Sequence, residues 1–105
     1  MKGNKFILYD WQLLCGEVEF HNELLSLVEG NIDKSKIKGG GRYHVHKKTN
    51  FVYFYGESHA YGKCEELDFM TAIGIRQQNY PCKGKIKRIV FSTKEYLSDV
   101  LKENE

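Results

Sequence analysis

The feature that most constrains this chain is the uninterrupted run Phe51-Val-Tyr-Phe-Tyr55, which is aromatic or β-branched throughout and predicts a β-strand. Residues 42–47 before it alternate in polarity, and Lys48-Thr49-Asn50 is typical of a turn, so a hairpin is predicted. A strand with one wet face would alternate, whereas this run is apolar at every position. We therefore expect a central strand with both faces covered by helices.

Two further strands are predicted, one before and one after this hairpin. Residues 5–9 are short, apolar and β-prone, and the apolar signal continues beyond them through Trp11, Leu13 and Leu14, which leaves the end of this strand open. Residues 85–91 alternate charged and apolar side chains up to Ile89-Val-Phe91 and predict another strand.

Helical spacing occurs in three segments. Residues 18–29 precede Gly30, which favours a helix end there, and residues 63–78 form a second predicted helix that ends before Pro81. A capping-box pattern, Ser92-x-x-Glu95, predicts a short terminal helix. The apolar positions are Leu24, Leu25 and Val28; then Cys64, Leu67, Met70 and Ile73; then Leu97, Val100 and Leu101. Together these elements predict an α+β fold, a single mixed β-sheet flanked by helices.

Length and charge limit the classes of protein this chain can join. With 105 residues it is expected to form a single domain, residues 1–105, and a formal charge of +2 is too balanced for general nucleic-acid binding. No apolar run approaches the roughly 18 to 20 residues that cross a bilayer, and no signal peptide is visible. Cys15, Cys64 and Cys82 are widely spaced and odd in number, so free thiols and a cytoplasmic location are expected.

Three glycines followed by an arginine, Gly39-Gly-Gly-Arg42, form the most unusual local pattern. One interpretation is that bare backbone approaches a ligand with its amides while Arg42 binds phosphate or carboxylate. The other is a flexible entry to a strand. The tetrapeptide alone leaves both open.

The segment Tyr55-Gly-Glu-Ser-His-Ala-Tyr-Gly62 connects the central strand to the second predicted helix, a position that often binds anions. The Ser58 hydroxyl and the amides around His59 and Ala60 are candidate phosphate donors. An ordinary strand-to-helix loop is the alternative.

Histidines suggest two kinds of chemistry. His21 lies in or near the first turn of a predicted helix, where amides disfavour protonation, so its imidazole is a candidate base; a surface residue is the alternative. Arg42, His44 and His46 share one strand face, which indicates either a solvated face or a zinc site. No further ligand completes a metal set, and no metal is expected.

The glycine-arginine motif, the Ser58 segment and Glu19-Phe-His-Asn22 resemble, in this combination, the motifs of the phosphohistidine phosphatase (janus/ocnus) family. That family has an acidic-aromatic-histidine motif, then a tri-glycine-arginine, then a tyrosine-glycine-x-serine-x-alanine-tyrosine-glycine. The resemblance covers residues 5–91, and the Ser58 segment is its most specific part.

The resemblance implies a metal-independent, cofactor-free protein histidine phosphatase that hydrolyses the N–P bond of phosphohistidine. His21 matches the catalytic histidine, regarded as the base that activates water, although direct attack on phosphorus stays open. Lys5, Arg42 and the loop of Ser58, His59 and Ala60 match phosphate-binding positions, and the amides of Gly41 and Asn22 are expected to add donors.

Departures from the family pattern leave alternatives. The chain between the first strand and His21 is shorter than in the relatives, so Lys2 competes with Lys5 for the lysine role. The expected partners are histidine-phosphorylated proteins as substrates, without nucleic acid or membrane, and the expected state is a monomer. A non-catalytic phosphoprotein-binding module that uses the same pocket is the alternative function.

Overall fold

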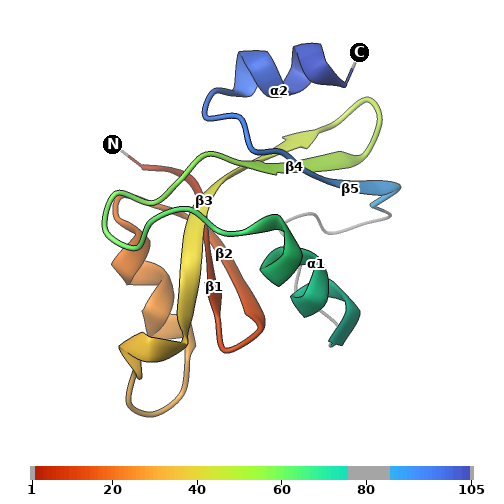
Figure 1. The fold of residues 1–105 in the computed structure, drawn as a ribbon. Coiled ribbons are helices and arrows are strands. Elements are labelled where there is room, and N and C mark those ends of the chain that lie inside the picture. The colour runs from red at the N-terminus through yellow and green to blue at the C-terminus, as the bar shows by residue number, and fades with distance from the viewer. Residues whose placement is uncertain (1, 76–85, 105) are drawn as a thin grey trace.

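The computed structural model describes residues 2–75 and 86–104, which form one mixed sheet with short helices around it (Figure 1). Within these residues the strand order is β2-β1-β3-β4-β5, and only β4 and β5 run parallel. The elements are β1 (Gly3–Tyr9), β2 (Gln12–Val18), η1 (His21–Leu27), η2 (Lys34–Lys36), β3 (Ile37–His46), β4 (Phe51–Tyr55), α1 (Glu66–Ile75), β5 (Arg88–Phe91) and α2 (Leu97–Glu103). The predicted α+β fold with a single mixed sheet is confirmed.

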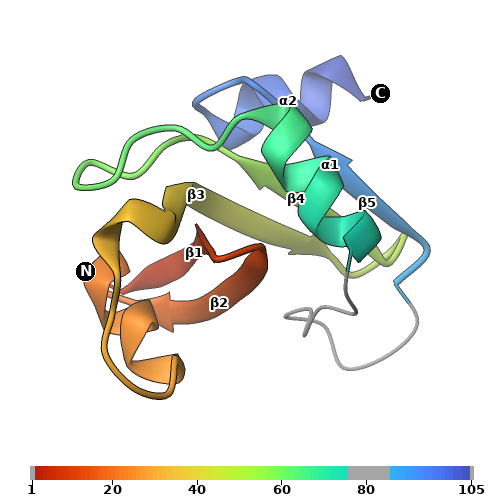
Figure 2. The same ribbon diagram turned by 60° about the horizontal axis from the view of Figure 1, so that its bottom comes forward.

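The predicted β3–β4 hairpin is present, and β4 is central as expected. Val52 and Phe54 of β4 belong to the same core cluster as Phe69 of α1, whereas Tyr53 and Tyr55 pack with Val100 of α2. Figure 2 shows α1 in front of β4 and β5 and α2 behind them. Because both of its faces are covered, β4 needs no polar alternation.

The prediction of a helix over residues 18–29 was right only in part, and the β1–β2 hairpin was not predicted. The chain reverses after Tyr9 and forms β2, which pairs antiparallel with β1, so the segment from residue 18 does not begin a helix. Asp10 and Trp11 carry the turn with φ of 47° and 63°, the left-handed values that a two-residue type I′ turn requires at both positions. The helical leucines form the 3₁₀ helix η1, which buries Leu24.

The predicted apolar face of α1 was right for Ile73, which packs against the core, but wrong for Leu67 and Met70. The helix buries Phe69 and Ala72, whereas Leu67 and Met70 are 77% and 52% exposed. Around the axis of an α-helix, residues three positions apart differ in direction by about 60°. A series of three-residue steps therefore moves around the helix and does not stay on one side of it. Cys64 is buried but precedes the helix, and the predicted boundaries at residues 78, 81 and 85 lie outside the described residues.

The terminal helix α2 is confirmed, but its predicted capping box is absent. Tyr96 occupies the N-cap position. The Ser92 hydroxyl instead accepts the Lys94 N–H at 3.1 Å and lies 3.2 Å from a Glu103 carboxylate oxygen. Ser92 therefore links the end of β5 to the end of α2.

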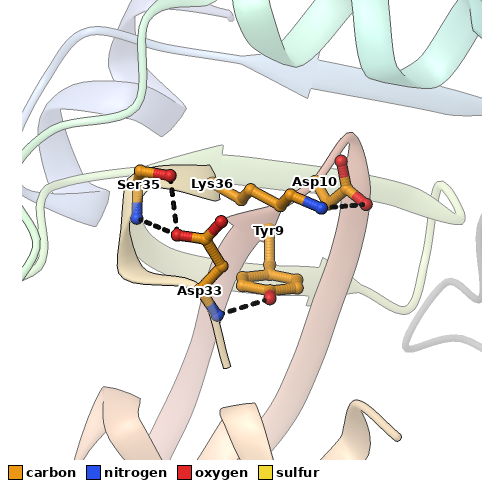
Figure 3. A network of polar contacts seen from close by, with 5 residues as sticks. All are labelled: Tyr9, Asp10, Asp33, Ser35 and Lys36. Carbon is orange, nitrogen blue, oxygen red and sulfur yellow. Dashed lines mark hydrogen bonds and ion pairs between the residues drawn. The ribbon is translucent and has the colours of Figure 1, made fainter. Parts of the chain in front are cut away.

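The crossing from η1 to β3 is fixed by polar contacts at the end of β1 (Figure 3). The Tyr9 hydroxyl accepts the Asp33 N–H at 2.9 Å, and the Asp33 carboxylate accepts two hydrogen bonds from Ser35. Lys36 lies 3.8 Å from Asp10. These contacts hold the start of β3 and hence the glycine segment that follows.

The two faces of the sheet have different cores. On the α1 face, one cluster contains Phe6, Leu8, Phe54 and Phe69. On the other face the buried residues form two clusters: Ile7, Tyr9, Leu14 and Leu24 next to η1, and Tyr53, Tyr55, Val90 and Val100 next to α2. By alternation along β3, Gly40, Arg42, His44 and His46 occupy the strip between these two clusters.

Candidate active site

A cleft of about 350 Å³ opens beside this strip, between η1 and the loop that leaves β4. Its lining residues are Lys5, Glu19, Phe20, His21, Asn22, Arg42, Glu57, His59, Ala60 and Tyr61. The structure therefore brings together most of the residues selected from the sequence. Gly41 and Ser58 do not line the cleft, and Lys5 rather than Lys2 does.

Two cations form the floor of the cleft. Lys5 of β1 and Arg42 of β3 are direct register partners, so their side chains share a face. The Lys5 ammonium donates to the carbonyls of Val18 and Glu19 at 3.0 and 2.7 Å. Since an ammonium has three donors, one N–H is left for an anion. The exposed Arg42 guanidinium has no hydrogen-bond or ion-pair partner within the described residues.

His21 begins η1 and is held by a backbone carbonyl of the glycine segment. Its Nε2 lies 2.8 Å from the Gly41 oxygen. Because a carbonyl only accepts, Nε2 must carry the proton, and in the neutral ring Nδ1 is then the acceptor. Gly41 contributes its carbonyl to this contact.

The surroundings of His21 favour its neutral form. Burial is the largest cause that lowers its pKa below the ordinary value, and the charges of Lys5 and Arg42 lower it further, against the opposing hydrogen bond to Gly41. The imidazole is therefore uncharged at neutral pH and able to accept a proton.

The start of η1 is held in place by its own backbone and by packing. The Glu23 carboxylate accepts the Phe20 N–H at 2.7 Å, one residue before His21. Leu24 is buried against the sheet, where a Cβ on Gly16 would lie 3.1 Å from it. His21 is thus fixed from both sides of the helix start.

The three glycines are required because other segments of the protein pack directly against their backbone. Neither of the two interpretations made from the sequence included this reason. All three are buried in β3. Gly39 has φ +96°, and a Cβ there would lie 2.5 Å from the Lys63 carbonyl. A Cβ on Gly40 would lie 2.5 Å from the Phe6 carbonyl and 3.3 Å from the His21 ring. The bare backbone thus lets the loop and His21 lie against the strand.

The loop after β4 is closed on itself. Ser58 and Gly62 exchange backbone hydrogen bonds of 3.1 and 2.8 Å, and the buried Ser58 hydroxyl accepts the Tyr61 N–H at 3.2 Å. Ser58 therefore shapes the loop. His59 and Ala60 line the cleft, and their backbone N–H groups have no partner within residues 2–75 and 86–104.

Four residues of the cleft were not selected as site residues from the sequence: Glu19, Phe20, Glu57 and Tyr61. Each lies within two residues of a residue that was selected, in the same sequence motif. That position in the motif was the signal by which they could have been found. Phe20 is 63% exposed at the rim, where it offers an apolar surface to a ligand.

The other candidate chemistry lies away from the cleft. His44 and His46 are neighbours with ring centroids 6.2 Å apart, but the described residues contain no group of three potential metal ligands. Cys15 and Cys64 are free thiols, and burial raises the pKa of each to about 12, so neither is an activated nucleophile. Cys82 lies outside the described residues.

Comparison with known proteins adds a family to this geometry. Across the described residues, no helix is long and apolar enough to cross a membrane. No curated protein and no solved structure matches the chain. The family model described as Janus/Ocnus family (Ocnus) matches residues 10–84, a range that includes His21, Arg42 and the Ser58 loop but not Lys5. On this match over more than half of its length, the chain belongs to the Janus/Ocnus family.

Proposed function

We propose that this protein is a metal-independent phosphohistidine phosphatase that hydrolyses the N–P bond of phosphohistidine in proteins. The observation that carries the proposal is the His21 ring, fixed through Nε2 by Gly41 at the edge of a cleft that contains two cations. A cleft that only bound phosphate would need the cations and amides but no base.

The proposed reaction uses each group at a definite stage. Arg42, the remaining Lys5 N–H and the free amides of His59 and Ala60 hold the phosphoryl oxygens. Nδ1 of His21 accepts a proton from water as the water oxygen attacks phosphorus. The N–P bond then breaks, and its electron pair leaves with the substrate imidazole. Histidine-phosphorylated cytoplasmic proteins are the proposed substrates of a monomeric enzyme.

Phosphate release from a phosphohistidine peptide in the presence of EDTA tests the proposal. We expect turnover by the wild type and a loss of at least about 10²-fold in His21→Ala, as for removal of a general base. His46→Ala is the matched control, because His46 lies on the same strip but outside the cleft. Circular dichroism verifies that each variant is folded.

The same experiment distinguishes the proposed function from the alternative one. A folded wild type that binds the peptide without releasing phosphate is a phosphoprotein-binding module and not an enzyme. Turnover that persists in His21→Ala contradicts the assignment of the base, and turnover that EDTA abolishes contradicts metal independence.

A further inference from the structure

The proposed hydrolysis has a proton requirement that His21 does not meet. When the N–P bond breaks, its electron pair goes to a ring nitrogen of the leaving histidine. A ring that is neutral before cleavage would leave as a strongly basic anion unless a proton is delivered to that nitrogen. His21 takes a proton from water in the same step, so a different group must give one.

A second histidine lines the same cleft from another element. His59 lies in the loop between β4 and α1, whereas His21 begins η1. The loop is held by the Ser58–Gly62 backbone pair and by the Ser58 hydroxyl, which fixes the backbone on either side of His59. The His59 side chain is exposed and has no hydrogen-bond partner within the described residues. It is therefore available to a bound substrate.

The charged groups beside the two histidines differ, although Arg42 lies beside both. His21 faces Lys5 and Arg42, which disfavour a second positive charge. His59 lines, with Arg42 and the carboxylates of Glu57 and Glu95, a smaller cavity of about 70 Å³ that adjoins the cleft. Carboxylates are suitable neighbours for a cationic ring. Glu19 and Tyr61 are the other ionisable side chains that line the main cleft.

We propose that His59 is the general acid of this reaction, a role that rests on the proposed phosphatase function. The water oxygen forms a bond to phosphorus, and Nδ1 of His21 takes the water proton. The N–P bond breaks, and its electron pair accepts a proton from the His59 imidazolium. Solvent then returns one proton to His59 and removes one from His21, so that phosphohistidine and water give histidine and phosphate.

The test uses a property of the substrate. A phosphohistidine ring that already carries a proton leaves as a neutral imidazole and needs no acid, and histidine rings titrate within the range of pH 5 to 8. Turnover of a phosphohistidine peptide is measured for wild type, His59→Ala and His59→Gln at about pH 7.5 and about pH 6, both within the range in which histidine rings titrate. The uncatalysed hydrolysis is subtracted at each pH, and His46→Ala serves as control.

We expect the ratio of wild-type kcat to His59→Ala kcat to be about 10² at the higher pH and to fall to about 10 or less at the lower pH. His59→Gln, which keeps a polar group but cannot give a proton, should behave in the same way. Added imidazole buffer should restore part of the rate of His59→Ala at the higher pH.

Two results would overturn this role for His59. Equal losses at both pH values mean that His59 binds or positions substrate, and unchanged kcat in both variants means that it takes no part. Both require an active wild type. Absence of turnover in the wild type itself would instead contradict the proposed function, and the two failures are thus distinguishable.

Discussion

The two faces of the sheet are covered in different ways. The α1 face has one continuous aromatic cluster, in which the Phe54 and Phe69 rings lie 4.9 Å apart and Phe6 packs edge-on against Phe54 at 5.3 Å. The other face has two separate clusters under η1 and α2, and the strip between them carries Arg42. The α1 face thus has a core without a gap, whereas the gap between the two clusters on the other face leaves polar groups open to a ligand.

The largest effect is expected from the continuous face. Phe69→Ala removes a fully buried ring that contacts three other phenylalanines, and should lower the free energy of unfolding by about 3 to 5 kcal/mol. Leu67→Ala on the exposed side of α1 is the matched control and should change it by no more than about 0.5 kcal/mol. Urea unfolding measures both. Equal effects of the two substitutions would contradict the assigned faces of α1.

Gly40→Ala tests the close contact between the strip and His21. The added Cβ would meet the Phe6 carbonyl and the His21 ring, so we expect a loss of about 1 to 3 kcal/mol in the free energy of unfolding, together with reduced turnover. Gly74→Ala is the opposite case, because nothing lies within 4 Å of its Cβ in α1. There alanine should stabilise the helix by about 0.5 to 1 kcal/mol. If both substitutions change the free energy of unfolding in the same direction, the contrast between these two glycines is refuted.

Arg42→Met should separate chemistry from stability. Loss of a donor to the phosphoryl oxygens is expected to lower kcat/KM by about 10²-fold, while urea unfolding of this exposed position changes by at most about 0.5 kcal/mol. Lys47→Met, exposed in the β3–β4 turn, is the control and should leave kcat/KM unchanged. A large loss of stability in Arg42→Met would assign Arg42 to the fold instead.

The same variant should shift the pH profile. Activity requires neutral His21, so kcat/KM falls as the pH drops through the pKa of His21, which lies below the ordinary value. Arg42 contributes to that lowering, and its removal raises the pKa. The acidic limb of kcat/KM in Arg42→Met should therefore move to higher pH. A limb at the wild-type position would contradict the role assigned to the Arg42 charge.

The smallest effect is expected at the start of η1. Glu23→Ala removes the acceptor of the Phe20 N–H and should cost about 1 kcal/mol or less in the free energy of unfolding. Glu23→Gln retains an acceptor oxygen and should lie between Glu23→Ala and the wild type. If Glu23→Ala and Glu23→Gln are indistinguishable in urea unfolding, this hydrogen bond does not hold η1.

The sequence predicted the central strand β4 better than it predicted the β1–β2 turn and the buried face of α1. The apolar run of β4 predicts a central strand, because a strand with both faces buried has no polar positions. The β1–β2 hairpin was not predicted because its left-handed turn is formed by Asp10 and Trp11 rather than by the usual Asn-Gly or Asp-Gly. Leucine spacing predicted a helix near residue 24 but not its 3₁₀ form.

For the site, the sequence selected His21, Lys5 and Arg42, and the structure places all three at one cleft. It did not reveal that Gly41 supplies a carbonyl to His21, since nothing in a glycine indicates which of its backbone groups is used. The inward position of Ser58 was equally hidden, because a serine in a glycine-rich loop suits both ligand binding and loop closure.

The central claim is that the open face holds a neutral, oriented imidazole, and NMR of ¹⁵N-labelled protein tests it most directly. A pH titration of the ring nitrogens reports both the pKa and the tautomer of His21, with His21→Ala giving the assignment. We predict the Nε2–H tautomer and a pKa below the ordinary value, as burial and the two cations require. A pKa at or above the ordinary histidine value of about 6.5, or the Nδ1–H tautomer, would contradict the account.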